Sequence, residues 1–373
     1  MTTMPVTVPK PLVLIAELTH RCPLHCVYCS NPLEMVRRDS ELPTDAWTRV
    51  VSEAAALGVL QADLTGGEPL ARTDLVEIVR AARGAGLYAS LITSGIPLDE
   101  RRLEELAGAG LDHLQLSFQG AREESSTEFA NASAGTWAQK VRVAHWVRQL
   151  RIGLTLNFVI HRENVDQLTE MIALGEEIGP GRIEFAHVQY YGWAFANRDR
   201  LLPTREQLGR SLEILKSAEE RLRGRTRVEY IVPDYYAKYP KACMEGWGHK
   251  ALIVTPGGDV LPCHAAKVTP GMSFENVRTR SLRQIWEESA AFRRFRGEDW
   301  MREPCRSCER RTVDFGGCRC QAYLLAGDAS ATDPVCSLSP QRHVVDSIVS
   351  ATNAPRAGMP PATQTWVYRA NPS

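Results

Sequence analysis

The sequence has little that would tie it to a membrane or to nucleic acid. No apolar run approaches the roughly 18 residues needed to span a bilayer. The N-terminus lacks the cationic segment, apolar core and cleavage site of a signal peptide. Basic and acidic residues are balanced at 44 each, so no net charge attracts a phosphate backbone or an anionic lipid surface. We therefore expect a cytoplasmic protein with neither nucleic acid nor a membrane as a partner.

Cysteine, by contrast, is plentiful and clustered. Three of the ten cysteines fall between residues 22 and 29, and seven fall between residues 243 and 336. The cytoplasm keeps thiols reduced, so disulfides are not expected there. The clustering therefore indicates metal or redox chemistry.

The first two thirds of the chain alternates short β-rich runs with helical patterns, six times over. The predicted strands are 12–18, 60–65, 88–93, 113–118, 153–160 and 182–189, and the predicted helices are 44–57, 73–85, 98–109, 136–150, 163–178 and 204–223. This alternation predicts an α/β fold with a parallel sheet and right-handed crossovers. Six units are too few for a closed eight-fold barrel, so we expect an open, partial (β/α)6 barrel with its site at the C-terminal ends of the strands.

The pattern changes after residue 224, where the alternation stops. Residues 251–263 are expected to form a hairpin and 281–295 a helix that begins with a capping box. The expected organisation is an N-terminal extension of residues 1–11, a barrel of 12–224, a small cysteine-rich α+β domain of 225–345 and a C-terminal tail of 346–373. Residues 354–373 are expected to be flexible.

The motif Cys22-x3-Cys26-x2-Cys29 directly follows the first predicted strand, at the mouth of the barrel. Structural zinc sites use four ligands, usually in paired C-x2-C knuckles, and neither His20 nor His25 has familiar knuckle spacing. A [4Fe-4S] cluster held by three thiolates instead leaves one iron open for another ligand. Zinc stays the alternative interpretation.

The three-cysteine motif, with Tyr28 before its last cysteine, resembles the signature of radical S-adenosylmethionine (SAM) enzymes. The resemblance implies that SAM chelates the open iron and that Tyr28 lies against its adenine. The segment "LTGGEP" ends the second predicted strand and resembles the family's GGE motif, which binds the SAM amino group. There Gly66 and Gly67 would allow close backbone approach to a ligand, and Glu68 would accept a hydrogen bond from its ammonium.

Four polar residues on later strands are further candidates for SAM contacts: Ser94, Ser117, Gln119 and Asn157. Each has an ordinary alternative, such as a turn or a hydrogen bond to neighbouring backbone. The aromatic stretch with Tyr190, Tyr191, Trp193 and Phe195 could bind a peptide, but docking of the second domain is favoured because aromatic residues mostly pack.

The remaining cysteines resemble the SPASM extension of radical SAM enzymes that modify peptides. Cys243, Gly258 and Cys263 fit the first half of its pattern, while Asp314 stands where the second half has a cysteine. The resemblance implies two auxiliary iron–sulfur clusters, both [4Fe-4S] or the first [2Fe-2S]. Auxiliary cluster I would use Cys243, Cys263, Cys318 and Cys320, and auxiliary cluster II would use Cys305, Cys308, Cys336 and Asp314. A loop hydrogen bond for Asp314, or zinc at the Cys305–Cys308 pair, is the alternative.

Among SPASM enzymes, residues 11–345 most closely resemble the PqqE family of PqqA peptide cyclases in pyrroloquinoline quinone (PQQ) biosynthesis. The implied reaction joins a glutamate γ-carbon of the PqqA peptide to a tyrosine ring carbon, with reductive cleavage of SAM to methionine and 5′-deoxyadenosine. The eleven residues before the first predicted strand are too few for a peptide-clamp domain, so the small chaperone PqqD is an expected partner. A flavodoxin or ferredoxin would supply electrons. The sequence singles out no general base.

Two other functions stay open. One is a different SPASM maturase, such as a sulfatase-maturing or thioether-forming enzyme. The other is a zinc-stabilised binding protein without catalysis.

Overall fold

One curved, open sheet organises the protein. The computed structural model describes residues 8–354 and 365–372, and within these residues nine strands pair in the order β7-β6-β5-β4-β3-β2-β1-β8-β9. All neighbours are parallel except β8 and β9. The strands are β1 Val13–Glu17, β2 Gln61–Thr65, β3 Tyr88–Thr93, β4 His113–Phe118, β5 Gly153–Ile160, β6 Arg182–His187, β7 Arg227–Ile231, β8 Ala251–Val254 and β9 Val260–Leu261. The prediction of a partial barrel is confirmed.

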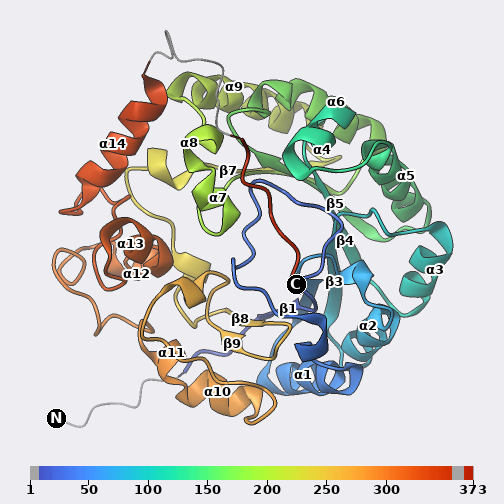
Figure 1. The fold of residues 1–373 in the computed structure, drawn as a ribbon, viewed down its shortest axis with the longest axis horizontal. Helices are drawn as coiled ribbons and strands as arrows, with labels where there is room; N and C mark the ends of the chain where they lie inside the picture. The colour runs from blue at the N-terminus through green and yellow to red at the C-terminus, as the bar shows by residue number, and fades with distance from the viewer. Residues whose placement is uncertain (1–7, 355–364, 373) are drawn as a thin grey trace.

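Helices cover the outside of this sheet (Figure 1). The helices of this part of the chain are α1 Thr44–Leu57, α2 Leu75–Gly84, α3 Glu100–Gly108, α4 Glu123–Ala130, α5 Thr136–Gln149, α6 Leu168–Ile178, α7 Trp193–Ala196, α8 Arg198–Leu201 and α9 Arg205–Leu222. The short helices α7 and α8 are not part of the outer layer, because their side chains pack with those of the cysteine loop. Strand residues alternate between the two faces. On β4, Leu114, Leu116 and Phe118 are fully buried in the core. His113, Gln115 and Ser117 alternate with them, are half-buried and face the interior of the barrel.

The sheet extends beyond the six predicted strands, at both ends. β7 continues it next to β6, and β8 pairs in parallel with β1. The expected hairpin of residues 251–263 is present as β8 and β9, but it belongs to the main sheet. The sequence ALIV of β8 is buried at all four positions, as expected for a parallel strand covered on both faces. Residue 224 is therefore not the end of the barrel sheet.

The cysteine-rich region is built from short elements packed beside the sheet. Its helices are α10 Leu282–Glu288, α11 Ala290–Arg293, α12 Arg311–Asp314 and α13 Arg319–Ala326. The capping box of Ser281 and Gln284 is confirmed. The single predicted helix 281–295 is wrong, because Ser289 takes an extended ψ of 132° and separates α10 from α11.

The C-terminal region is more ordered than the sequence indicated. Helix α14 spans Arg342–Asn353, and residues 365–372 pack back onto the barrel mouth, where Trp366 is 9% and Arg369 only 2% exposed. Figure 1 shows this dark red segment crossing the face of the barrel toward β1. The predicted flexible tail is wrong for these residues, and its other parts, 355–364 and 373, lie outside the described residues.

Across residues 8–354 and 365–372, none of the helices combines the length and the apolar character that a bilayer crossing requires.

Candidate functional site

The loop after β1 carries Cys22, Cys26 and Cys29 at the C-terminal mouth of the barrel. Backbone bonds from His25 N to Ala130 O and from Val27 N to Phe129 O, both 2.9 Å, hold the loop against the end of α4. All ten cysteines lie in the described chain and are free thiols. Burial of the thiol groups raises the pKa of all three cysteines, that of Cys26 to about 12. The loop therefore collects sulfur ligands that need a cationic centre to ionise together.

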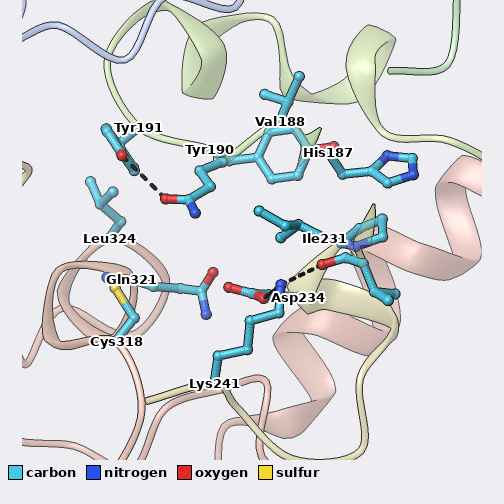
Figure 2. Close-up of a pocket in the computed structure, with 13 residues that line it drawn as sticks. His187, Val188, Tyr190, Tyr191, Ile231, Asp234, Lys241, Cys318, Gln321 and Leu324 are labelled. Atoms are coloured by element: carbon cyan, nitrogen blue, oxygen red, sulfur yellow. Dashed lines mark hydrogen bonds and ion pairs between the residues drawn. The ribbon is translucent and has the colours of Figure 1, made fainter. Parts of the chain in front are cut away.

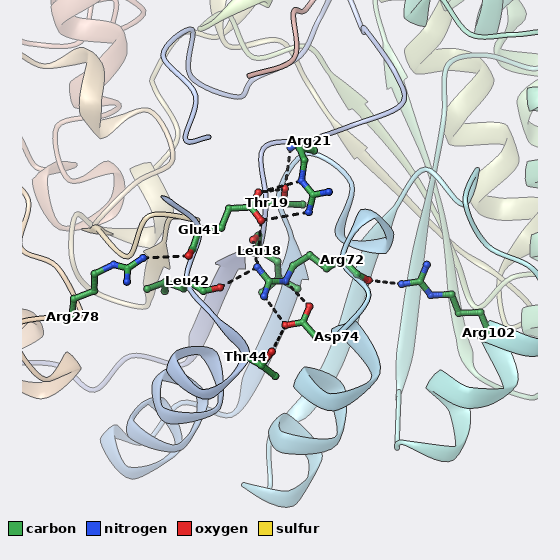
Figure 3. A network of polar contacts seen from close by, with 10 residues as sticks. All are labelled: Leu18, Thr19, Arg21, Glu41, Leu42, Thr44, Arg72, Asp74, Arg102 and Arg278. Carbon is green, nitrogen blue, oxygen red and sulfur yellow. Dashed lines mark hydrogen bonds and ion pairs between the residues drawn. The ribbon is translucent and has the colours of Figure 1, made fainter. Parts of the chain in front are cut away.

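A polar network anchors the start of this loop (Figure 3). Arg72 donates to the carbonyl oxygens of Leu18 and Leu42 at 3.2 and 3.1 Å and forms an ion pair with Asp74 at 2.6 Å. Glu41 accepts a hydrogen bond from the Thr19 hydroxyl and faces Arg21 at 3.5 Å. These contacts fix the exit of β1 to the starts of α1 and α2, so the cysteine loop begins from a rigid point.

The turn after β2 packs directly onto the cysteine loop. A Cβ atom added to Gly66, whose φ is +134°, would lie 2.3 Å from Thr19 O, and one added to Gly67 would lie 2.4 Å from Arg21 O. The Gly67 N–H also donates to Thr19 O at 2.5 Å. The two glycines are needed for close approach, as predicted. The group they approach, however, is the backbone before Cys22.

The Glu68 side chain is oriented differently from the expectation. It is fully buried and accepts hydrogen bonds from Leu70 N at 3.1 Å, from the Thr93 hydroxyl at 2.6 Å, and from both the backbone N–H and hydroxyl of Ser94. Four donors match the acceptor capacity of a carboxylate. The expected bond from the Glu68 carboxylate to a ligand ammonium is therefore not supported, because the carboxylate ties the β2 and β3 turns together. Ser94 is part of this tie.

Two aromatic side chains beside the loop each bury a polar atom that has no hydrogen-bond partner in the described residues. These atoms are the Tyr28 hydroxyl and His161 Nε2, whose rings lie 5.5 Å apart. Burial raises the pKa of Tyr28 well above its ordinary value and lowers that of His161 to about 3, so both side chains are neutral. Orphaned buried polar groups call for an explanation such as a missing ligand. A flat aromatic face with two unused polar atoms suits a nucleoside such as the adenosine of SAM.

Of the other predicted SAM contacts, Gln119 is hydrogen-bonded to Lys140, and Ser117 and Asn157 lie in a row across neighbouring strands. The Gln119 amide oxygen accepts a hydrogen bond from Lys140 Nζ at 2.5 Å, and Lys140 also donates to Ser117 O at 2.8 Å. Ser117 and Asn157 stand opposite each other on β4 and β5, in a row that continues to Glu184 on β6. Burial raises the pKa of Glu184. The barrel interior is thus polar near the predicted site.

The predicted ligands of auxiliary cluster I lie together. The thiol of Cys243 is within hydrogen-bonding reach of Cys263 and Cys318, and Cys320 is within reach of the same two. The four sulfurs therefore form a closed ring. Hydrogen bonds from two neighbouring thiols lower the pKa of Cys263 to about 5, while the pKa of Cys318 is raised to about 12 by its interaction with Cys243. Four converging thiols fit a fully ligated iron–sulfur cluster.

The predicted ligands of auxiliary cluster II line one small cavity. Cys305, Cys308, Asp314 and Cys336 all face it. Asp314 Oδ1 also accepts a hydrogen bond from Gly316 N at 3.1 Å, and Oδ2 lies 3.4 Å from Arg310 Nε. Asp314 therefore makes the loop hydrogen bond of the alternative interpretation and faces the three thiols as well.

Within the described residues, no three His, Cys, Asp or Glu side chains come together as the ligands of one single metal ion.

The aromatic stretch after β6 lies at the seam between the barrel and the cysteine-rich region. Tyr190 packs against Tyr235 with ring centroids 5.1 Å apart, and Tyr191 packs in the cluster that contains Cys263 and Cys320. Figure 2 shows both tyrosines lining a cavity with Cys318 and Gln321 on its other side. The docking role is confirmed for these two residues.

Two cations at the site were not found from the sequence. Lys140 is fully buried, and Arg369 is nearly so. A signal for Lys140 was present, because it lies on the buried stripe of α5 with Val143, Ala144 and Val147. A charge on such a stripe needs a partner. Arg369 comes from the far end of the chain, and its own segment carries no comparable signal.

Comparisons with known proteins agree with this geometry. The profile described as "Radical SAM superfamily" matches residues 16–175, and that described as "Iron-sulfur cluster-binding domain" (SPASM) matches 243–309. SuiB of Streptococcus suis bound to S-adenosylmethionine is a structural neighbour with a TM-score of 0.73 at 19% identity, covering 88% of this chain and 77% of its own. AnSMEcpe with AdoMet and a peptide gives a TM-score of 0.62 at 17% identity, covering 91% and 96%. These likenesses show the fold.

Fold and matched profiles together define a radical SAM enzyme with a SPASM extension, which uses an iron–sulfur cluster and SAM. Full-length relatives narrow this class. A PqqA peptide cyclase of Methylobacterium nodulans is 53% identical over 348 residues, covering 93% of this chain and 92% of the relative. One of Gluconobacter oxydans is 53% identical over 352 residues, covering 94% and 98%. The chain belongs to the family of PqqA peptide cyclases.

Proposed function

We propose that this enzyme forms the carbon–carbon cross-link between a glutamate γ-carbon and a tyrosine ring carbon of the PqqA precursor peptide, a step of PQQ biosynthesis. The observation that carries the proposal is the three-thiol loop at the barrel mouth, in a chain 53% identical to PqqA peptide cyclases along nearly its whole length. Three sulfur ligands leave an open position at which a cofactor can be activated.

The residues at the mouth have distinct roles in this proposal. Cys22, Cys26 and Cys29 would hold a [4Fe-4S] cluster, and the turn at Gly66 and Gly67, packed on the start of the cysteine loop, would lie at the SAM amino group. Tyr28 and His161 offer their unpartnered polar atoms to the adenosine. Ser94, Ser117, Gln119 and Asn157 stay candidate SAM contacts. When bound, the cluster and SAM supply a 5′-deoxyadenosyl radical that removes a hydrogen atom from an unactivated carbon.

The cysteine-rich region fits the second half of the reaction. Bonding of the glutamate carbon to the tyrosine ring requires the loss of one hydrogen atom, and then of one electron and one proton to restore aromaticity. Cys243, Cys263, Cys318 and Cys320 would hold auxiliary cluster I, and Cys305, Cys308, Cys336 and Asp314 would hold auxiliary cluster II. Such clusters would supply an acceptor for that electron. The ring of four sulfurs and the shared cavity support these ligand sets.

The proposed partners follow from this chemistry. PqqA is the substrate, PqqD presents it, and a flavodoxin or ferredoxin delivers the electron that starts the reaction. The proposed compartment is the reducing cytoplasm, which suits the ten free thiols.

The test is mass spectrometry of PqqA after anaerobic incubation with the enzyme, PqqD, SAM and a reductant. The expected product has lost two hydrogen atoms, and fragmentation places the link between glutamate and tyrosine. An unchanged peptide accompanied by 5′-deoxyadenosine would keep the SAM chemistry but reject PqqA as the substrate. An unchanged peptide without 5′-deoxyadenosine, from protein with a full iron content, would reject the proposed reaction.

A further inference from the structure

Residues 365–372 lie directly on the cysteine loop, although they are more than 300 residues away in sequence. Asn371 pairs with the backbone of Cys22 in both directions, accepting from its N–H at 3.0 Å and donating to its carbonyl at 2.9 Å. His25 Nδ1 is 2.6 Å from Arg369 O. Asn197 fixes the other end of the segment by donating to Val367 O at 2.8 Å and accepting from Val367 N at 3.0 Å. We call residues 365–372 the C-terminal strap.

The strap places a buried cation beside the three thiols. The Arg369 guanidinium donates to His20 O and to Asn371 Oδ1, the latter at 2.9 Å, and also contacts Met35 Sδ at 3.4 Å. Its Nε is buried and has no hydrogen-bond partner among residues 8–354 and 365–372. Its known partners are all neutral, and a buried charge without an opposite charge is costly. This arrangement indicates that an anion is missing from the site.

The three cysteines identify that anion. The Arg369 guanidinium donates to the carbonyl of His20, two residues before Cys22, and Asn371 of the same strap pairs with the backbone of Cys22 itself. The Arg369 carbonyl lies 2.6 Å from Nδ1 of His25, the residue before Cys26. A cluster held by three thiolates carries net negative charge, and its reduction adds one more.

We propose that Arg369 is a positioning residue for the SAM-binding cluster, held by the C-terminal strap so that its charge stabilises the reduced cluster. The inference rests on the proposed cluster at Cys22, Cys26 and Cys29. A fixed positive charge favours the more negative of two redox states, and its effect is strong where water is excluded. Without Arg369 the cluster should still assemble but become harder to reduce.

The test is a reductive titration of the full-length protein without SAM, followed by electron paramagnetic resonance. The cluster's signal is the one that a Cys22→Ala/Cys26→Ala/Cys29→Ala variant lacks. In Arg369→Gln we expect the ratio of reduced to oxidised cluster at a fixed potential to fall about tenfold, equivalent to about 59 mV for one electron. Arg369→Lys keeps the charge and should recover most of this loss.

Tyr368→Phe is the matched control. It removes one tie of the strap, the 2.8 Å bond from Tyr368 to Glu128 O, and leaves the charge in place. We expect its potential to equal that of the wild type. Equal potentials in Arg369→Gln and the wild type, at equal iron content, would overturn the proposal. A shift seen only after SAM is added would also overturn it, because the anion would then be the SAM carboxylate.

If Arg369→Gln does not retain the cluster, Asn371→Ala provides the decisive measurement. It frees the guanidinium at one nitrogen without removing its charge, so a smaller shift in the same direction is expected. An unchanged potential in Asn371→Ala with its cluster intact would overturn the proposal. A complete absence of the signal from wild-type protein would reject the proposed cluster itself, which is a different result.

Discussion

Auxiliary site I and the three-cysteine site at the barrel mouth differ in which parts of the chain surround their sulfurs. The four sulfurs of auxiliary site I lie within hydrogen-bonding reach of one another in a closed ring. At the barrel mouth, two buried cations from distant segments act on Cys26, namely Lys140 on α5 and Arg369 on the strap. The complete ligand set thus comes from one region of the chain, residues 243–320, whereas the open site at the mouth has cations from α5 and from the C-terminal strap beside it.

The largest expected effect, on SAM cleavage and iron content, comes from replacing the cysteines of each site in turn. Cys22→Ala/Cys26→Ala/Cys29→Ala should abolish SAM cleavage completely, because no open iron remains, and should keep the iron of the auxiliary sites. Cys320→Ala should lose the iron of auxiliary site I and still cleave SAM. The measurements are 5′-deoxyadenosine by chromatography and iron per protein. Production of 5′-deoxyadenosine by the triple variant would contradict the assignment of SAM cleavage to the barrel-mouth site.

Asp314 tests a site that stands between these two extremes, with three thiols and one carboxylate. Asp314→Ala should lower the iron content of auxiliary site II and reduce cross-linking several-fold, while SAM cleavage persists. Asp314→Cys supplies a softer ligand and should hold iron more firmly at a changed potential. Iron analysis and product mass spectrometry measure both effects. Unchanged cross-linking by Asp314→Ala would remove auxiliary site II from the reaction.

Lys140 should have a smaller, pH-dependent effect on SAM affinity. Burial lowers its pKa to about 8, so the ammonium near Cys26 is present below that pH and is lost above it. SAM affinity of the wild type should therefore fall as pH rises through about 8, and Lys140→Arg should remove this dependence. Lys140→Met leaves the Gln119 amide oxygen without its donor, at a cost of about 1–3 kcal/mol. Calorimetric titrations with SAM at several pH values would show a flat wild-type profile if this is wrong.

The smallest effect concerns the coupling of the two regions. Thr204→Ala removes the cap of α9 in the barrel, and Ser281→Ala removes that of α10 in the cysteine-rich region. Each should lower the free energy of unfolding by about 1 kcal/mol. Because β8 continues the barrel sheet, both variants should shift one common denaturation transition. Separate transitions, each moved by only one variant, would show that the regions unfold independently.

Local patterns predicted much of this molecule. β3, β4 and β5 end at the predicted residues, since alternating strands and capped helices are encoded within short windows. The residues of each auxiliary ligand set that the SPASM resemblance implied lie near one another. Pairing of β8 with β1 was missed because contacts between distant segments leave no periodic signal.

Contacts between distant segments were also missed at the barrel-mouth site. The sequence correctly singled out Gly66 and Gly67 as close-approach positions but not what they approach. It suggested a ligand for the Glu68 carboxylate, whereas donors from the β3 turn and Leu70 occupy it. Arg369 reaches His20 across 349 residues, which no local pattern encodes.

The pairing of β1 with β8 also bears on electron transfer between the two proposed clusters. Cys22 follows β1 and Cys263 follows β9, and β8 lies between these two strands and pairs with both, so the two cysteine sites are attached to one sheet. Electron tunnelling slows steeply with distance, and attachment to one continuous sheet restricts changes in the distance between the two sites. We therefore expect the rate of electron transfer between the barrel-mouth site and auxiliary site I to be insensitive to solvent viscosity.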